Sequence, residues 1–313
     1  MIVVTGAAGF IGSNIIRGLN QIGITDIVAV DDLTDGKKFR NLAVINYHDY
    51  MDYRDFLAKI ISDGVFESDI TAMFHQGACS DTTEWNGRFM MENNYDYSKS
   101  LLQYCLDKKI PFIYASSAAV YGAKNNFDDR DPNQLPLNVY GYSKLKFDEY
   151  VQSYVYRAES QIVGLRYFNV YGPHENHKGK MASVAFHLMN QLRDHGVAKL
   201  FSAYGGYGDG EHERDFIFVE DVVKVNLWFY QHPAKKGIFN CGTGQPRCFN
   251  DIAKKLIQLN GGGKLNYIPF PDSLKGTYQC FTQANLSALR EIGFTESFTS
   301  LEAGLEKYFA WFH

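Results

Sequence analysis

The clearest hydrophobic pattern in the chain lies at its start. Residues 1–4 are apolar and rich in β-branched side chains, which predicts a buried strand. Apolar residues then recur at helical spacing over residues 15–19, which predicts a helix. Gly6, Gly9 and Gly12 stand between the two elements at a spacing of three. A strand, a glycine turn and a helix in this order form the context that a phosphate-binding loop requires.

Apolar runs and helical patterns continue to alternate through the first half of the chain. They predict strands at 27–32, 72–79, 111–117 and 161–169, and helices at 52–61, 86–109 and 140–156. This alternation predicts an α/β fold of the Rossmann type, with a doubly wound parallel sheet. Ligands of such sheets bind at the carboxyl ends of the strands, so the glycine loop, Asp31 and Ser117 should converge there.

Beyond about residue 168 the alternation becomes irregular, and glycine turns separate short strands and short helices. We expect residues 1–168 to form a dinucleotide-binding Rossmann domain that later segments, at about 213–241, rejoin. Residues 169–313 should then form a smaller, mixed α/β substrate-binding part.

Composition narrows the possible functions. The net charge of −4 gives no basic footprint for nucleic acid. Five cysteines without a CxxC pair argue for reduced thiols and a cytoplasmic protein. No apolar stretch approaches the roughly eighteen residues of a membrane span. The start of the chain lacks a basic segment followed by an apolar helix, so no targeting signal is expected.

The glycine loop predicts a dinucleotide site, although glycines alone also fit an ordinary tight turn. Gly6 allows the turn, Gly9 admits a pyrophosphate close to the backbone, and Gly12 allows close packing of the helix. The pyrophosphate would lie at the positive N-terminal end of the helix. Asp31 and Asp32 end the next strand about twenty residues further on, the spacing expected for a ribose contact.

The choice between NAD and NADP stays open at this level. The carboxylates of Asp31 and Asp32 suit an unmodified adenosine ribose, which favours NAD. Lys37, Lys38 and Arg40 follow at once and suit a 2′-phosphate, which favours NADP.

Tyr140 and Lys144 form the candidate catalytic pair. They are four residues apart on a predicted helix and therefore share one face. A nearby ammonium group is expected to lower the pKa of the tyrosine, which would make it a general acid/base. The same spacing also occurs in the pairs Tyr95/Lys99, Tyr104/Lys108 and Tyr142/Lys146. Position favours Tyr140, because its helix follows the strand that ends in the hydroxyl of Ser117.

Three motifs carry a resemblance to a known superfamily. They are the glycine loop, the string Ser116-Ser-Ala-Ala-Val-Tyr-Gly122 and the string Tyr140-Gly-Tyr-Ser-Lys144. Together they resemble the extended short-chain dehydrogenase/reductase superfamily. More narrowly, the chain resembles the ADP-L-glycero-D-manno-heptose 6-epimerase family from end to end. The strings that carry this match start at residues 76, 82, 166, 177 and 267: Gln-Gly-Ala-Cys-Ser, Thr-Thr-Glu-Trp, Arg-Tyr-Phe-Asn-Val-Tyr-Gly-Pro, His-Lys-Gly and Tyr-Ile-Pro-Phe-Pro.

The resemblance implies NADP as the cofactor, with Lys38 at the 2′-phosphate beside Asp31 and Asp32. It further implies cofactor contacts from Phe10, Ile11, Gln76, Gly77, Ala78, Cys79, Ser80, Asn93, Lys144 and Val170. It implies substrate contacts from Asn169, Lys178, Lys180, His187, Phe201, Ser202, Ala203, Tyr204, Arg214 and Tyr278. The chain departs from the family in having Lys180 where a serine is common and Tyr53 where a lysine is common.

The implied activity is epimerisation at C6″ of ADP-D-glycero-D-manno-heptose, through a transient ketone, for lipopolysaccharide inner-core precursors. Ser117 would help to bind the reacting oxygen, and Tyr140 and Lys178 would act as acid/base groups on opposite faces of the carbon. Lys178 could instead only bind the diphosphate of the nucleotide sugar. The resemblance also implies a homo-oligomer, such as a pentamer.

Three alternatives accompany this interpretation. A UDP-hexose 4-epimerase would use the same Ser117, Tyr140 and Lys144 without a second base. A 4,6-dehydratase is disfavoured, because Ala118 and Ala119 follow Ser117 where such enzymes carry Asp-Glu. A non-catalytic NADP-binding protein on the same fold is the alternative from another class. No metal site is expected, because His174 and His177 lack a third partner in a Gly/Pro loop.

Overall fold

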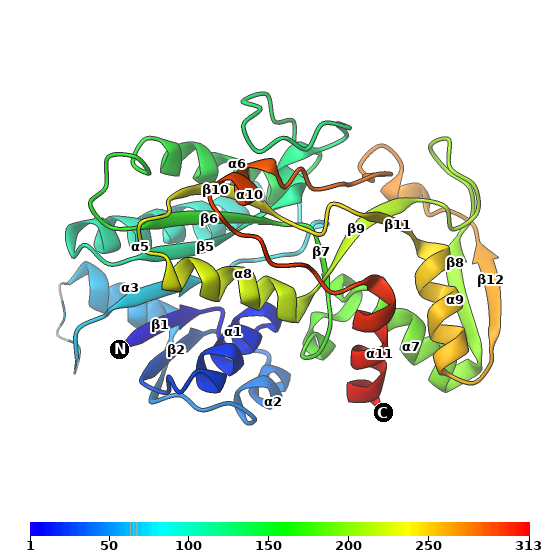
Figure 1. Ribbon diagram of the computed structural model, residues 1–313, viewed down its shortest axis with the longest axis horizontal. Helices are drawn as coiled ribbons and strands as arrows, with labels where there is room; N and C mark the ends of the chain where they lie inside the picture. The colour runs from blue at the N-terminus through cyan, green and yellow to red at the C-terminus, as the bar shows by residue number, and fades with distance from the viewer. Residues whose placement is uncertain (63, 65, 67) are drawn as a thin grey trace.

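A seven-stranded parallel sheet forms the centre of the computed structural model, which describes residues 1–62, 64, 66 and 68–313. Its strand order is β10-β6-β5-β4-β1-β2-β3, as the doubly wound fold predicts (Figure 1). The strands are β1 (Ile2–Thr5), β2 (Ile27–Asp31), β3 (Asp49–Asp52), β4 (Ala72–His75), β5 (Phe112–Ser117), β6 (Ile162–Tyr167) and β10 (Gly237–Cys241).

Two apolar layers cover this sheet. On one face pack α1 (Phe10–Gln21) and α8 (Val219–Gln231), whose buried aliphatic side chains meet those of β1 and β4. On the other face pack α3 (Tyr53–Ile61), α5 (Tyr97–Asp107) and α6 (Val139–Gln152). The Asn138 side chain caps α6 by accepting a 2.8 Å hydrogen bond from the Gly141 N–H. This cap fixes the start of the helix that carries Tyr140.

Smaller elements complete the chain. A three-stranded sheet contains β7 (Asn169–Tyr171), β9 (Glu213–Phe218) and β11 (Pro246–Cys248), and a two-stranded sheet contains β8 (Val197–Phe201) and β12 (Lys264–Ile268). The remaining helices are α2 (Phe39–Leu42), α4 (Gly87–Met91), α7 (Val184–His195), α9 (Phe249–Leu259), α10 (Ser287–Glu291) and α11 (Leu301–Phe312). Short 3₁₀ turns are η1 (Gly36–Lys38), η3 (Ala118–Tyr121), η4 (Asn176–Met181) and η5 (Asp272–Leu274), and η2 (Glu92–Asp96) is a π-turn.

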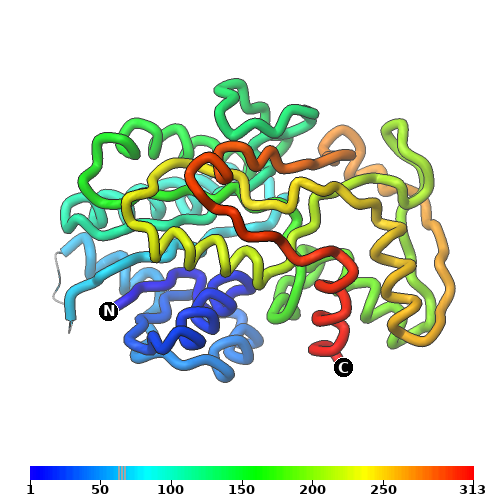
Figure 2. Tube along the Cα trace, in the orientation of Figure 1, coloured from blue at the N-terminus to red at the C-terminus, as the bar shows by residue number. Residues whose placement is uncertain are grey.

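The chain leaves the large sheet at Phe168, between β6 and β7, and part of it returns later. Within residues 213–241, β9 pairs in the small sheet, whereas α8 and β10 join the large one. The division into two domains stays a prediction. The C-terminal helix α11 runs back beside the segment that leads into α7 (Figure 2). None of the helices in the described residues has the length and apolarity that crossing a membrane requires.

The sequence pattern missed β3. Asp49–Asp52 is an edge strand whose residues are exposed or half-buried, so no apolar run marks it. The helix expected at 86–109 is present as α4, η2 and α5 in succession.

Candidate active site

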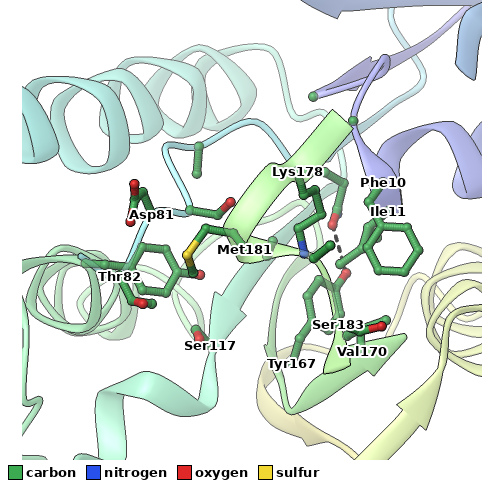
Figure 3. A pocket seen from close by; sticks show the side chains of 18 of the residues that line it. Phe10, Ile11, Asp81, Thr82, Ser117, Tyr167, Val170, Lys178, Met181 and Ser183 are labelled. Atoms are coloured by element: carbon green, nitrogen blue, oxygen red, sulfur yellow. Dashed lines mark hydrogen bonds between the residues drawn. The ribbon is translucent and has the colours of Figure 1, made fainter. Parts of the chain in front are cut away.

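A cavity of about 680 Å³ opens at the carboxyl ends of the central strands. Residues that follow β1, β2, β4, β5 and β6 line its wall together with the start of α6 and the turn η4. This is the place at which a doubly wound sheet binds its ligand. Figure 3 shows Phe10, Ile11 and Lys178 on one side of the cavity, and Thr82 and Ser117 on another.

The glycine loop has the geometry of a phosphate cradle. Gly6 adopts a left-handed φ of +67°, which favours glycine. A Cβ atom on Gly12 would lie 2.1 Å from the Gly6 carbonyl oxygen, so only glycine permits this close packing. Gly9 precedes α1 and no side chain caps the helix. The first backbone N–H groups of α1 therefore remain free at the cavity wall, where they can bind an anion.

Asp31 and Lys38 form an ion pair at the end of β2. The buried Asp31 carboxylate accepts a 2.7 Å hydrogen bond from the Ala8 N–H through Oδ2, and Lys38 Nζ binds Oδ1. Lys38 Nζ also donates to the Asp32 carbonyl oxygen at 2.6 Å. A carboxylate and an ammonium group therefore lie side by side at the end of β2, where the adenosine ribose of a dinucleotide is expected. This pair alone does not decide between NAD and NADP.

An adjoining cavity of about 200 Å³ extends the site beyond Asp32. Asn93, which the sequence predicts to contact the cofactor, lines it, and so does Tyr53, which stands where the family often has lysine. Phe89 and Tyr97 also line it and were missed, because nothing distinguishes them from core aromatics in the sequence. These rings and amides suit a planar base at the far end of a dinucleotide.

Gln76 supplies an independent test of the cofactor assignment. Its Oε1 accepts a 3.0 Å hydrogen bond from the Tyr167 hydroxyl, whereas its buried Nε2 has no hydrogen-bond partner among the described residues. Buried donors are normally satisfied, so an unpaired one on the wall of this cavity fits a polar ligand. The residues present therefore fit a nicotinamide dinucleotide. The same wall contains five further residues for which cofactor contacts are predicted: Gly77, Ala78, Cys79, Ser80 and Val170.

Ser117, Tyr140 and Lys144 meet in the main cavity. Lys144 Nζ donates to the Ala115 carbonyl oxygen at 2.9 Å. Burial lowers the pKa of Lys144 to about 8, although the nearby Asp148 carboxylate opposes the shift. Burial raises the pKa of Tyr140, and its hydrogen bond with Ser117 opposes that shift. The expected lowering of the Tyr140 pKa is therefore wrong, because the cost of desolvating the phenolate exceeds the stabilisation that the Ser117 hydrogen bond gives it.

The other three Tyr/Lys pairs lie outside this cavity. Lys99 stacks over the Tyr95 ring at 4.5 Å and pairs with Asp96 on the surface. Lys146 pairs with Glu149, beside the exposed Tyr142 ring. Position in the cavity therefore distinguishes Tyr140 from the tyrosines of the other three Tyr/Lys pairs.

Lys178 enters the cavity from η4. Its ammonium nitrogen lies 5.2 Å from the centre of the Phe10 ring, and its side chain points into the cavity beside Ile11 (Figure 3). Burial lowers the pKa of Lys178, and the Glu175 carboxylate opposes the shift. Such an amine exchanges protons more readily near neutral pH than an exposed lysine does.

A neighbouring cavity of about 850 Å³ shares Asn169 and Lys180 with the first, and Arg214 and Tyr278 line it. Arg214 is buried and lies 4.7 Å from the centre of the Tyr278 ring. Lys180 donates a 2.6 Å hydrogen bond to Thr83 Oγ1. Four of the predicted substrate residues thus surround a space next to the acid/base groups.

Not every predicted substrate residue lines the 680 Å³ cavity or the 850 Å³ cavity. The residues outside both linings are His187, Phe201, Ser202, Ala203 and Tyr204. Tyr204 and Phe201 pack on Phe270, which in turn contacts Tyr278, so they support the second cavity from behind. His187 lies on α7 against Phe186. In the described residues, no group of three or more His, Cys, Asp or Glu side chains could hold a metal ion.

Comparison with known proteins agrees with this geometry. A sequence model of the NAD dependent epimerase/dehydratase family matches residues 2–242. The structure resembles the Helicobacter pylori ADP-L-glycero-D-manno-heptose-6-epimerase, with 33% identity over 100% of this chain and 96% of that chain and a TM-score of 0.86. It also resembles a UDP-N-acetylglucosamine 4-epimerase from Methanobrevibacter ruminantium, with 26% identity, coverage of 99% and 97% and a TM-score of 0.84. The UDP-glucuronic acid 4-epimerase from Bacillus cereus, solved with UDP-glucuronic acid and NAD, has 25% identity, coverage of 99% and 98% and a TM-score of 0.80.

Proposed function

The chain belongs to the NAD dependent epimerase/dehydratase family, and we propose that it inverts C6″ of ADP-D-glycero-D-manno-heptose to give the L-glycero-D-manno epimer. The reaction passes through a transient ketone and uses bound NADP, and its product serves lipopolysaccharide inner-core synthesis. The 33% identity to a heptose epimerase over the whole chain supports this substrate.

The observation that carries the proposal is the presence of two acid/base candidates in one cavity. Tyr140 comes from α6 and Lys178 from η4, so the two groups approach from different elements. Inversion requires proton transfer at the C6″ oxygen in both epimers, and one fixed group serves one epimer only. Tyr140 and Lys178 would each handle the hydroxyl proton of one of them.

The cofactor supplies a nicotinamide ring that accepts a hydride and returns it. The glycine loop and the N-terminus of α1 would bind its pyrophosphate, and Asp31, Asp32 and Lys38 its adenosine ribose. Lys38 is the residue that favours NADP, because its ammonium group suits a 2′-phosphate. Ser117 would orient the Tyr140 hydroxyl through the hydrogen bond between them. The buried Lys144, one helical turn further along α6, would supply a positive charge on the same wall of the cavity.

The testing experiment incubates the purified protein with ADP-D-glycero-D-manno-heptose and follows the configuration at C6″ by NMR. Inversion at C6″ supports the proposal. Inversion at C4 of a UDP-hexose instead would establish the second candidate, a UDP-hexose 4-epimerase, which the similarity to two UDP-sugar 4-epimerases favours. No turnover of either substrate, with no change in nicotinamide absorbance, would indicate a non-catalytic binding protein.

We also propose a cytoplasmic homo-oligomer, such as a pentamer. All five cysteines are described and free, which fits a reducing compartment. Light scattering on the purified protein would give the number of subunits.

A further inference from the structure

A fourth cavity, of about 470 Å³, lies behind the loop that carries Lys178. Its wall comes from α1, the stretch through η1 and α2, the loop around residues 174–177 and the end of α11, which lie on the same side of the molecule (Figure 1). The side chains that give it chemistry are Arg17, Lys37, Arg40, His174, His177 and Trp311. Its volume is within the range of roughly 300–1,000 Å³ that small-molecule sites occupy.

The charge on this wall is one-sided. Arg17, Lys37 and Arg40 are all exposed, and within the described part of the chain none of them forms an ion pair. Among the residues that the structure describes, no carboxylate lines the cavity. Asp31 and Asp35 lie close enough to His177 to influence its pKa, but Asp31 is already paired with Lys38. Three cations without an ion-pair partner in the described residues thus surround one cavity, and together they create a local field that attracts anions.

Aromatic surface completes the wall. The Trp311 side chain is 39% exposed, and its ring lies 5.3 Å from the His174 ring. The buried Asn41 contacts both imidazoles, at 3.2 Å from His174 Nδ1 and 3.3 Å from His177 Nδ1. The two histidines are therefore fixed in place, and an indole face stands open beside the cations.

We propose that this cavity is a second ligand site and that it binds a nucleoside phosphate. The phosphate would be held by Arg17, Lys37 and Arg40, since guanidinium and ammonium groups bind phosphate oxygens through charge-assisted hydrogen bonds. The base would stack against Trp311.

The site is distinct from the dinucleotide cavity. Arg17, Arg40 and Trp311 are absent from the wall of that cavity, and His177 is the residue that the two share. Because Lys178 follows His177 directly, a ligand here would adjoin the segment that carries the second acid/base candidate. The site needs neither the heptose substrate nor turnover, so its test is independent of the proposed function.

The experiment titrates AMP into the purified protein with its cofactor bound, and records tryptophan fluorescence and binding heat. We expect saturable binding with a Kd below about 1 mM and a fluorescence change that Trp311→Phe removes. The double variant Arg17→Gln/Arg40→Gln should weaken this binding by about tenfold or more. The matched control Lys254→Gln/Lys264→Gln removes two exposed charges elsewhere and should leave the binding unchanged.

Three results would overturn the proposal. AMP binding that the double variant leaves intact would place the nucleotide in the substrate cavity. An equal loss in the control pair would show unspecific attraction to positive charge. A change of oligomeric mass in Trp311→Phe would show that a second copy of the chain covers the cavity. Circular dichroism of each variant checks its folding, and Lys37→Gln gives a milder test if the double variant does not fold.

Discussion

The Tyr308 hydroxyl donates a 2.9 Å hydrogen bond to Oε1 of Glu175, three residues before Lys178. The Glu175 carboxylate is fully buried and also accepts hydrogen bonds from the Ser183 hydroxyl and N–H. It thereby fastens the C-terminal helix α11 to the segment that places Lys178 in the cavity. The negative charge of Glu175 also raises the pKa of Lys178 and so opposes the lowering that burial causes.

We expect Tyr308→Phe to destabilise the fold while leaving the chemistry largely intact. The change removes one donor from a buried carboxylate that keeps its bonds to Ser183, so the free energy of unfolding should fall by about 1–3 kcal/mol. Urea unfolding measures this loss. Tyr156→Phe, at a residue that is 83% exposed, should cost almost nothing. Equal stability of the two variants would show that the Tyr308–Glu175 bond contributes nothing.

The cofactor prediction concerns Lys38. We expect the protein to purify with NADP, because a hydride that returns within each turnover needs no cofactor exchange. Mass spectrometry of the supernatant after heat denaturation identifies the cofactor. Lys38→Gln should weaken NADP binding by about tenfold relative to NAD, since it removes the charge beside the 2′-phosphate. Lys254→Gln is the control. Recovery of NAD alone from the unmodified protein would mean that Asp31 and Asp32 determine the choice.

The two tyrosines that the sequence could not separate by spacing provide the next test. Tyr140→Phe removes the hydroxyl that lies in the cavity and should lower kcat by roughly 10²–10⁴-fold. Tyr95→Phe changes a ring outside the cavity, against which Lys99 stacks, and should leave kcat within a few-fold of normal. Similar losses in both variants, measured with the same substrate, would refute the assignment of Tyr140.

Much of this site follows from local sequence, because the elements that form it are local. The glycine loop, the end of β2 and the start of α6 each have a signature of apolar runs and small or polar residues within a few positions. Parallel pairing then brings them together, as Thr5 pairs with both Val30 and His75 in the sheet. The topology of a doubly wound parallel sheet is therefore enough to predict that these elements converge.

Other features depend on contacts that a linear pattern does not contain. The link between Glu175 and Tyr308 spans 133 residues, and neither residue belongs to a motif. The raised pKa of Tyr140 reflects burial, which the spacing to Lys144 does not reveal. Residues 201–204 were expected at the substrate, but they lie outside both cavity linings, and Phe201 and Tyr204 pack on Phe270. Tertiary packing, which the linear pattern does not contain, sets the path of such irregular loops.

The depressed pKa of Lys144 predicts a pH dependence of stability. Folded Lys144 releases its proton near pH 8, whereas its ordinary value is 10.5. Between these values the unfolded chain holds more protons than the folded one, so the free energy of unfolding rises with pH through this window. Lys144→Met lacks this contribution. The stability difference, unmodified protein minus variant, should therefore grow by a few kcal/mol from pH 8 to 10.5. Urea unfolding across this range measures it, and a flat difference would contradict the buried, shifted ammonium.

The last prediction separates the two roles of Lys178. Lys178→Met keeps most of the side-chain length and removes the amine. If Tyr140 and Lys178 each handle the hydroxyl proton of one epimer, kcat for epimerisation should fall by at least roughly 10²-fold while the cofactor stays bound. Once the variant is loaded with the reduced cofactor, hydride transfer from that cofactor to an aldehyde analogue of the sugar needs one acid only and should continue through Tyr140. If Lys178 only binds the diphosphate, KM should rise while kcat is preserved, because uniform binding is lost. Steady-state kinetics at saturating substrate decide between these outcomes, and a near-normal kcat would exclude the two-base mechanism.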